Sequence, residues 1–322
     1  MINTDKGNSV KKFIGIDIGG MSIKGMIIRG DGTELCRDTI ETGCEKGGSA
    51  MCDNIVTLIN RMIQSIGGYK TDIKGVGIGC PGFIDSKGGY VIFAGNLNLK
   101  YFPLQKEVSD RVGLPVRIAN DGHAAALGEA RFGAGKKFKD SILVTLGTGI
   151  GGGIIVDGQL FEGGKSVGTE IGHTVIVADG YPCSCGRKGC FECYASATAL
   201  MRKTREEMRA NKDSLMWENY TPESVSGLTA FEYMDRDQSA KNVVDWYVKH
   251  LAIGVVNLAN VFRPEAVMFG GGVSGQKERL TAPVQQLVDK EIFAGTDFAP
   301  VKIVTASLGS KAGAYGAAAL LM

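Results

Sequence analysis

Glycine is the residue that most constrains how this chain folds, because its 47 glycines gather in clusters along the 322 residues. Each cluster follows or lies inside a run rich in β-branched residues. Glycine in such a place lets the backbone adopt a positive φ and approach a ligand closely. The pattern therefore predicts strands that end in tight turns. The clusters are DIGG (17–20), GVGIGCPG (75–82), GTGIGGG (147–153) and FGGGVSG (269–275).

Strand-like and helix-like segments alternate along the chain, which predicts an α/β fold. Strands are expected at 12–18, 23–28, 74–79, 115–119, 266–269 and 301–305, and a strand, turn and strand at 141–156. Helices are expected at 51–66, 104–112, 122–132, 194–210, 228–236, 239–262, 277–291 and 312–321.

A weak internal repeat indicates how the chain is organised. IGGMSIKGMIIRGDG (18–32) and LGTGIGGGIIVDG (146–158) both contain a turn of small residues, an apolar strand and then Asp-Gly. The repeat predicts two related α/β domains that face each other, with both glycine turns on one cleft. A chance likeness of two strand–turn–strand units is the alternative. We expect a smaller domain of residues 1–119 with 310–322, and a larger domain of residues 120–309.

Composition excludes several classes of partner. The chain is 44% hydrophobic and 22% charged with a net charge of +2, as in an ordinary globular protein that binds neither nucleic acid nor a membrane. Residues 1–12 contain no apolar segment typical of a signal peptide, and no run of about 18 apolar residues could cross a bilayer. We therefore expect a cytoplasmic protein whose eight cysteines are reduced.

The first glycine turn carries the residues of a phosphate site. Asp17 ends a predicted strand, Gly19 and Gly20 form the turn, and Lys24 follows. Backbone N–H groups in such a turn can hold phosphate oxygens, and Asp17 can hold Mg²⁺ through water. Ordinary turn chemistry explains Asp-x-Gly-Gly equally well, and Lys24 can be a solvated charge.

A second phosphate turn is expected at Gly147, Thr148 and Gly149. Neither turn has the Walker spacing, and a strand rather than a helix follows the second one, which argues against a dinucleotide-binding Rossmann unit. Gly271 and Gly272 precede a predicted helix. They can cover an adenine or ribose, or permit tight packing of strand on helix.

Four side chains have the spacing of a zinc site. His173, Cys183, Cys185 and Cys190 form the pattern H-x9-C-x-C-x4-C. One imidazole and three thiolates complete a tetrahedral site and leave no open position, which predicts a structural zinc ion. Cys193 is a competing thiol, and reduced cysteines without metal are the alternative.

Carboxylates lie beside the zinc pattern and after the strand at 115–119. Glu170 and Glu192 flank the cysteines, where they can accept hydrogen bonds from sugar hydroxyls or remain solvated surface charges. Asn120 and Asp121 open an alanine-rich helix, so either residue can cap that helix. Asp121 can instead be the base that accepts the proton of an attacking hydroxyl in phosphoryl transfer. The residues by themselves leave these alternatives open.

The chain resembles the ROK family (repressor, open reading frame, kinase) over nearly its whole length. The resemblance is carried by GHTVIVADGYPCSCGRKGCFE (172–192), with Ser196 four residues beyond, in which every zinc ligand of the family signature is present. DIGGMSIKG (17–25) is similar to the nucleotide loop of the family, although Met21 stands where a threonine is common.

The resemblance implies an actin-like, hexokinase-like (ribonuclease H-like) two-domain fold with the sugar in the interdomain cleft. It also implies a structural Zn²⁺ ion, Mg²⁺ bound with ATP, and a homo-oligomer, either a dimer or a tetramer. Asp121 matches the catalytic base. Sugar contacts are implied for Gly82, Asn96, Asn120, Asp121, Glu170, His173 and Glu192.

The activity that the resemblance implies is an ATP-dependent hexose kinase acting on the 6-hydroxyl of glucose. N-Acetylmannosamine, N-acetylglucosamine, fructose and allose are alternative acceptors. Repressors of the family carry an N-terminal helix-turn-helix, and only eleven residues precede the first predicted strand here. A non-catalytic repressor is therefore not expected.

Overall fold

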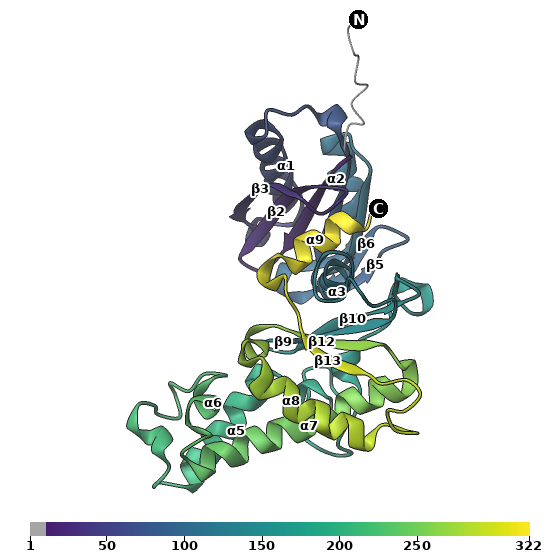
Figure 1. The fold of residues 1–322 in the computed structure, drawn as a ribbon. Helices are drawn as coiled ribbons and strands as arrows, with labels where there is room; N and C mark the ends of the chain where they lie inside the picture. Colours follow the sequence, from purple (N-terminus) through teal and green to yellow (C-terminus); the bar gives the residue numbers. More distant parts are fainter. Residues whose placement is uncertain (1–10) are drawn as a thin grey trace, which may run out of the picture. The chain divides into compact units, whose positions relative to one another are not determined.

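The computed structural model describes residues 11–322, so the expectation that residues 1–12 carry no signal peptide lies almost wholly outside the described part. The chain packs into two compact units (Figure 1). Of the described residues, the first contains 11–132, Glu162–Gly168 and Lys311–Met322, and the second contains Gly133–Phe161 and Thr169–Ser310. Residues 121–132 thus pack with the first unit, and the division into domains at residue 120 stays a prediction.

The first unit is built on a five-stranded mixed sheet. Its central strand β1 pairs antiparallel with β2 and parallel with β4, and β4 pairs parallel with β8. In spatial order the strands are β3 (Glu34–Glu41), β2 (Ser22–Arg29), β1 (Lys12–Ile18), β4 (Ile73–Cys80) and β8 (Val116–Asn120).

The second unit repeats this topology. Its central strand β9 pairs antiparallel with β10 and parallel with β12, and β12 pairs parallel with β13. In order the strands are β11 (Gln159–Phe161), β10 (Ile150–Val156), β9 (Ser141–Leu146), β12 (Ala266–Gly270) and β13 (Lys302–Thr305). Two five-stranded mixed sheets of one topology confirm the predicted α/β class of this two-unit fold.

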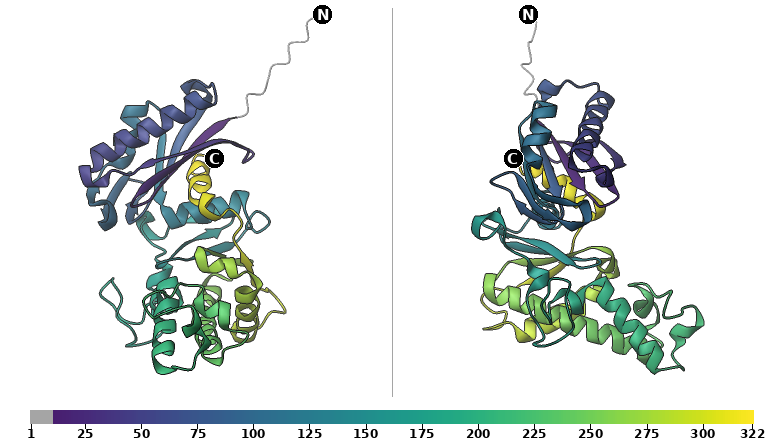
Figure 2. Two further views of the ribbon diagram at one scale, coloured as in Figure 1. Left: turned by 90° about the vertical axis from the view of Figure 1, so that its left-hand side faces the viewer. Right: turned by 180° about the vertical axis from the view of Figure 1, so that it is seen from behind.

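Helices cover both faces of the first sheet. α1 (Gly48–Ser65) lies across one face (Figure 2), where its buried residues contact the isoleucines of the strands. α2 (Leu104–Val112) packs beside α1. On the other face, α9 (Ala312–Ala319) packs against β1 and β4, and α3 (Asp121–Phe132) packs against α9 (Figure 1).

The helix α9 approaches the sheet and α3 more closely than side chains would permit. A Cβ atom on Gly77 would lie 1.7 Å from the carbonyl oxygen of Ala317, and one on Gly316 would lie 1.5 Å from that of Ala124. Glycine is therefore required on both the strand and the helix. This contact places the start of α9 beside the end of β1.

A further sheet was not predicted from the sequence. The strands β5 (Phe83–Asp85), β6 (Tyr90–Ala94) and β7 (Leu99–Phe102) form a three-stranded antiparallel sheet in the first unit. They are three to five residues long and partly exposed, so they lack a long apolar signal.

The second unit packs a helical layer on its sheet. Its core gathers large side chains from several elements, including Phe191, Phe231, Tyr247 and Phe269. The long helix α7 ends at Phe262, and its C-cap residue Arg263, whose φ is 44°, directly precedes Pro264, as the sequence predicts. The helices are α4 (Glu192–Ala195), α5 (Ala197–Ala210), α6 (Thr229–Tyr233), α7 (Gln238–Phe262) and α8 (Glu278–Glu291).

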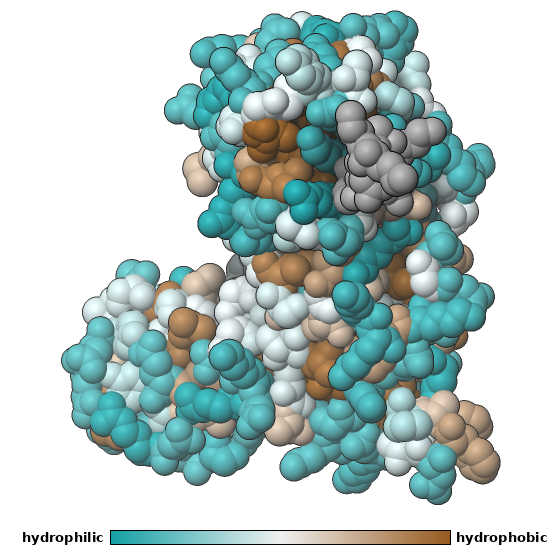
Figure 3. Space-filling model, turned by 45° about the horizontal axis from the view of Figure 1, so that its top comes forward, coloured by the Kyte–Doolittle hydropathy of each residue, from teal (hydrophilic) through white to brown (hydrophobic). Residues whose placement is uncertain are grey.

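Hydrophilic residues predominate on the face drawn in Figure 3, and hydrophobic residues form separate patches. Among the described residues, none of the helices combines the length and the apolar character that crossing a bilayer requires.

Candidate active site

The carboxyl ends of three parallel strands bring the predicted residues of the first unit together. β1 ends at Ile18, directly after Asp17, β4 ends at Cys80, and β8 ends at Asn120. In the ladder Asp17 lies opposite Gly79, and Cys80 lies opposite Asn120. Parallel strands end at one edge of a sheet, which is where ligands bind in open α/β sheets.

The structure separates the two polar residues that open α3. The Oδ1 atom of Asn120 accepts hydrogen bonds from the backbone N–H groups of Gly122 (2.9 Å) and His123 (3.3 Å), so Asn120 caps the helix. Its Nδ2 atom donates to the carbonyl oxygen of Gly82 at 3.0 Å. Asp121 accepts one local bond, from the N–H of Gly122 at 2.9 Å. Capping therefore accounts for Asn120 and leaves the Asp121 carboxylate available for chemistry.

Asp121 and Asp17 form a pair of half-buried carboxyl groups. Burial and, second to it, the negative charge of Asp121 raise the pKa of Asp17 to about 6, although Lys24 on the neighbouring strand opposes this rise. Burial also raises the pKa of Asp121. A Cβ atom on Gly313, at the start of α9, would lie 2.7 Å from the Asp17 carboxyl carbon. Two repelling carboxylates with little room around them form a donor set that fits a divalent cation such as Mg²⁺.

Replacing Asp17 by asparagine is expected to stabilise the ligand-free protein at neutral pH. The folded-state pKa of Asp17, about 6, lies above its ordinary value of 3.8, so ionisation above pH 6 opposes folding. The cost is on the order of 2 kcal/mol once partial exposure is allowed for. We expect thermal unfolding at pH 7.5 to show a higher Tm for Asp17→Asn, by several degrees.

The pH dependence of this gain is the control. As pH falls from about 6 towards 4, wild-type Asp17 takes up its proton in the folded state, so the gain in Tm should shrink. The matched variant Asp110→Asn, on the exposed surface of α2, should show no such gain. A lower Tm for Asp17→Asn at pH 7.5 would show that the carboxylate stabilises the fold.

The first glycine turn uses part of its hydrogen-bonding capacity internally. The N–H of Gly19 donates to the carbonyl oxygen of Ser22 at 2.9 Å, which closes the turn. Met21 is 90% exposed. Thr42, which sequence reasoning missed, holds the turn because its hydroxyl donates to the oxygen of Gly19 at 2.6 Å.

Asn96 lies beside this turn. It belongs to the short 3-10 helix η3 (Gly95–Leu97), and its Nδ2 atom is 4.0 Å from the position of a Cβ atom on Gly20. The thiol of Cys44 lies 3.7 Å from the oxygen of Gly20 and 3.8 Å from that of Asn96, so it bridges the two loops. Gly82 has a φ of 106°, and a Cβ atom there would lie 2.3 Å from the carbonyl oxygen of Phe93. Gly82 therefore fills a position that only glycine can occupy without strain.

In the second unit, the turn of Gly147–Gly149 joins β9 to β10. The N–H of Gly147 donates to the oxygen of Gly149 at 3.1 Å, so this turn also closes on its first glycine. Gly271 lies against it, since a Cβ atom on Gly271 would lie 2.6 Å from the carbonyl of Leu146. Gly272 opens the 3-10 helix η7 (Gly272–Gln276), and α8 starts at Glu278, one residue after the helix start expected from the sequence.

The predicted zinc ligands converge. One donor atom from each of His173, Cys183, Cys185 and Cys190 lies within 4.8 Å of all the others. The Sγ atoms of Cys185 and Cys190 are 3.7 Å apart, and Sγ of Cys183 is 3.5 Å from Nδ1 of His173. A tetrahedron with zinc–sulfur bonds of about 2.3 Å has edges of about 3.8 Å, so these spacings fit a structural zinc ion. The backbone N–H of Arg187 lowers the pKa of Cys185, which favours the thiolate that binds metal.

Cys193 lies outside this cluster of four. Its thiol is 3.5 Å from the carbonyl oxygen of Pro182, and the structure does not group it with the convergent donor atoms. The predicted set of four ligands therefore needs no change.

The predicted sugar contacts of the second unit surround the cluster. His173 turns Nδ1 towards the cysteines, which leaves Nε2 for another partner. Oε1 of Glu192 lies 3.1 Å from Sγ of Cys183 and 3.6 Å from Nδ1 of His173. Glu170 precedes the 3-10 helix η5 (Ile171–His173), and its carbonyl oxygen accepts from the N–H of His173 at 3.1 Å. Glu170, His173 and Glu192 thus border one loop.

Two other histidines pack within the protein. Burial lowers the pKa of His123 to about 4, so this side chain is neutral at physiological pH. The ring of His250 stacks on Tyr194 with centroids 5.0 Å apart. His123 thus packs as part of α3, and His250 as part of α7.

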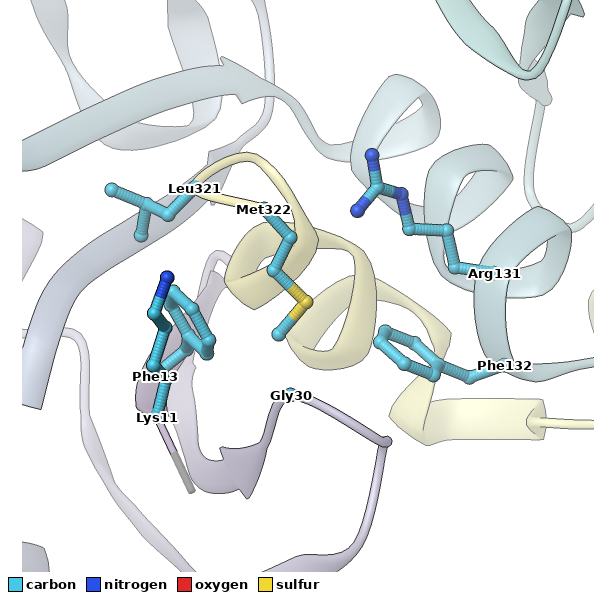
Figure 4. A pocket seen from close by; sticks show the side chains of 7 residues that line it. All are labelled: Lys11, Phe13, Gly30, Arg131, Phe132, Leu321 and Met322. Carbon is cyan, nitrogen blue, oxygen red and sulfur yellow. The ribbon is translucent and has the colours of Figure 1, made fainter. Parts of the chain in front are cut away.

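A cavity of about 420 Å³ lies elsewhere in the first unit (Figure 4). Lys11 and Phe13 at the start of β1, Arg131 and Phe132 at the end of α3, and Met322 line it, together with Gly30 and Leu321. Because Asp17 lies at the opposite end of β1, this cavity is not the site of the predicted phosphate turn.

Known proteins are similar to the chain over nearly its whole length. Residues 13–322 match the ROK family. A glucokinase of Halalkalibacterium halodurans is 36% identical over 94% of this chain and 93% of that protein. The structure resembles that of a ROK family glucokinase from Streptomyces griseus in complex with glucose and AMPPNP, with a TM-score of 0.79, 34% identity and coverage of 96% of this chain and 98% of that one. A xylose repressor of Caldicellulosiruptor bescii is 30% identical over 100% of this chain and 79% of the repressor.

Proposed function

The chain belongs to the ROK family and is an ATP-dependent sugar kinase, and we propose that its acceptor is glucose, phosphorylated on the 6-hydroxyl. One observation carries the assignment of the chemistry. Asp121 lies beside Asp17 at the carboxyl edge of the first sheet, while the neighbouring Asn120 performs the capping role that would otherwise explain Asp121. The glucokinases among the relatives support glucose as the acceptor.

In the proposed reaction, Asp121 accepts the proton of the 6-hydroxyl. The hydroxyl oxygen forms a bond to the γ-phosphorus of ATP while the bond from that phosphorus to the bridging oxygen breaks, and ADP leaves. Burial raises the pKa of Asp121, which makes its carboxylate a better proton acceptor than an exposed one. The residues proposed to contact the sugar are Gly82, Asn96, Asn120, Glu170, His173 and Glu192.

The nucleotide is proposed to contact the glycine turns. Gly19, Gly20 and Lys24 are proposed to bind phosphate oxygens of the nucleotide. Gly147, Thr148 and Gly149 are proposed to bind phosphate oxygens as well. Gly271 and Gly272 border the nucleoside. Asp17 would hold Mg²⁺, which neutralises charge on the phosphates when it is bound. His173, Cys183, Cys185 and Cys190 would hold Zn²⁺, which fixes the loop that carries the sugar contacts.

A panel of hexoses tests the acceptor. With ATP and Mg²⁺, ADP release is expected to be fastest in kcat/KM with glucose, ahead of mannose, fructose, allose, N-acetylmannosamine and N-acetylglucosamine. A site that hydrogen-bonds the 2-hydroxyl discriminates against an acetamido group by size and by lost hydrogen bonds. A higher kcat/KM with an N-acetylhexosamine than with glucose would show that the N-acetylhexosamine is the acceptor. Product analysis by NMR would show which hydroxyl carries the phosphate.

The xylose repressor among the relatives supports a sugar-binding regulator as the second candidate function. The two functions differ in turnover, since a regulator binds sugar without releasing ADP. Absence of ADP release with all sugars of the panel, together with sugar binding by calorimetry, would favour the regulator.

A further inference from the structure

One short segment contacts every residue of the second glycine turn. The N–H of Ala197 donates to the oxygen of Gly147 at 2.8 Å, and the hydroxyl of Thr198 donates to the oxygen of Thr148 at 2.7 Å. Oε2 of Glu192 lies 2.7 Å from the position of a Cβ atom on Gly149. The turn is therefore seated on residues 192–198, the segment that carries α4 and the start of α5.

These contacts decide where the N–H groups of the turn point. In a planar trans peptide the carbonyl oxygen and the N–H of the next residue point in opposite directions. Holding the oxygens of Gly147 and Thr148 towards α5 thus directs the N–H groups of Thr148 and Gly149 away from α5. Because glycine allows many backbone conformations, a contact from outside the turn is needed to select this one.

The same segment is continuous with the zinc loop. It begins two residues after Cys190, and the Oε1 atom of Glu192 contacts the thiol of Cys183 at 3.1 Å. Its middle is fixed, since Ala195 is buried and its carbonyl oxygen accepts from the hydroxyl of Tyr247 at 2.8 Å. Ser196 then caps α5. Residues 192–198 therefore connect the zinc loop directly to the glycine turn.

We propose that Thr198 is a positioning residue for nucleotide binding and that residues 192–198 couple zinc binding to nucleotide binding. The proposal rests on the proposed role of Gly147–Gly149 in holding ATP phosphates. It extends the role of the zinc loop from the sugar to the nucleotide. Occupancy of the cluster by zinc then strengthens nucleotide binding even when no sugar is present.

The test is titration of the zinc-loaded full chain with ADP by calorimetry, without sugar. Thr198→Val keeps the branched shape but removes the donor to Thr148, and it is expected to raise the Kd for ADP about fivefold to tenfold. Zinc content should stay at wild-type level, the KM for the hexose should change less than twofold, and Thr198→Ser should restore ADP affinity. Thr204→Val is the matched control in the same helix, because its hydroxyl bonds only the oxygen of Leu200 within α5. Its Kd for ADP should be that of the wild type.

The coupling has its own measurement. Removal of zinc with a chelator is expected to raise the Kd for ADP of the wild type by a larger factor than that of Thr198→Val, which has already lost the connecting contact. Equal factors, an unchanged Kd after zinc removal, or wild-type ADP affinity in Thr198→Val would each overturn the proposal. These titrations need no turnover. If the hexose panel fails while Thr198→Val weakens ADP binding, the proposed acceptor is wrong and the positioning role stands.

Discussion

Replacing Asp121 by asparagine is expected to lower kcat about a thousandfold, the middle of the range that a general base contributes. Asparagine keeps the shape of the side chain and its bond to the N–H of Gly122, but it cannot accept the proton of the sugar hydroxyl. The Kd for ADP should stay close to that of the wild type, and the Tm should be at least as high, because burial raises the pKa of Asp121 and its charge repels Asp17. A coupled assay of ADP release and a calorimetric titration measure the two effects separately.

The matched control for this variant is Asp157→Asn. Asp157 is exposed, pairs with Lys139 and lies outside the proposed site, so its kcat should be that of the wild type. Retention of more than about a tenth of kcat by Asp121→Asn would exclude Asp121 as the base. Removing its charge should also lower the pKa of Asp17, which Asp121 now raises.

Replacing Cys185 by serine is expected to remove zinc and sugar binding together. A serine hydroxyl does not supply the thiolate that the tetrahedral site needs, and the three remaining donors bind zinc far more weakly. His173 is one of the four donors, and Glu192 contacts the thiol of Cys183. Loss of the ion should therefore release two proposed sugar contacts at once. Zinc content by mass spectrometry should fall below about a tenth of an ion per chain, and glucose binding should become undetectable by calorimetry.

Cys36→Ser is the control for the loss of a thiol. Cys36 lies on β3 and its thiol is 3.6 Å from the carbonyl oxygen of Met62, outside the zinc cluster. This variant should keep its zinc and its sugar affinity. Full zinc content in Cys185→Ser would show that another donor, such as Cys193, completes the site.

The fold was largely predictable because glycine turns mark the ends of its central strands. The repeat at 18–32 and 146–158 predicted related units, and the two sheets share one strand order. The sequence did not predict the edge strands that are too exposed or too short to show an apolar pattern. β3, with the sequence ELCRDTIE, has no fully buried residue, and β11 is three residues long. Their pairing depends on a neighbouring strand rather than on their own composition.

The residues of the site were predictable where local spacing determines their position, and not where contacts between distant parts of the sequence do. The zinc ligands were predictable because short spacings in one loop restrict where their side chains can go. Asn120 and Asp121 could not be told apart, since which of two adjacent polar residues caps a helix depends on side-chain conformation. Thr42 and Thr198 hold turns that lie 23 and 50 positions away in the sequence, so no local pattern identified them.

The close packing of α9 against the first sheet and α3, which requires glycine at the contacts, has a consequence for how the protein is synthesised. The strand that carries Asp17 is synthesised first, but the helix that packs on it is formed by residues 312–319. While the ribosome is still translating the second unit, the close-packed faces of β1, β4 and α3 lack their partner. The first unit can therefore complete its core only after the second unit has been translated. A substitution that blocks the docking of α9 should disturb Asp17 by leaving the first unit incompletely folded, although nearly the whole chain separates the two in sequence.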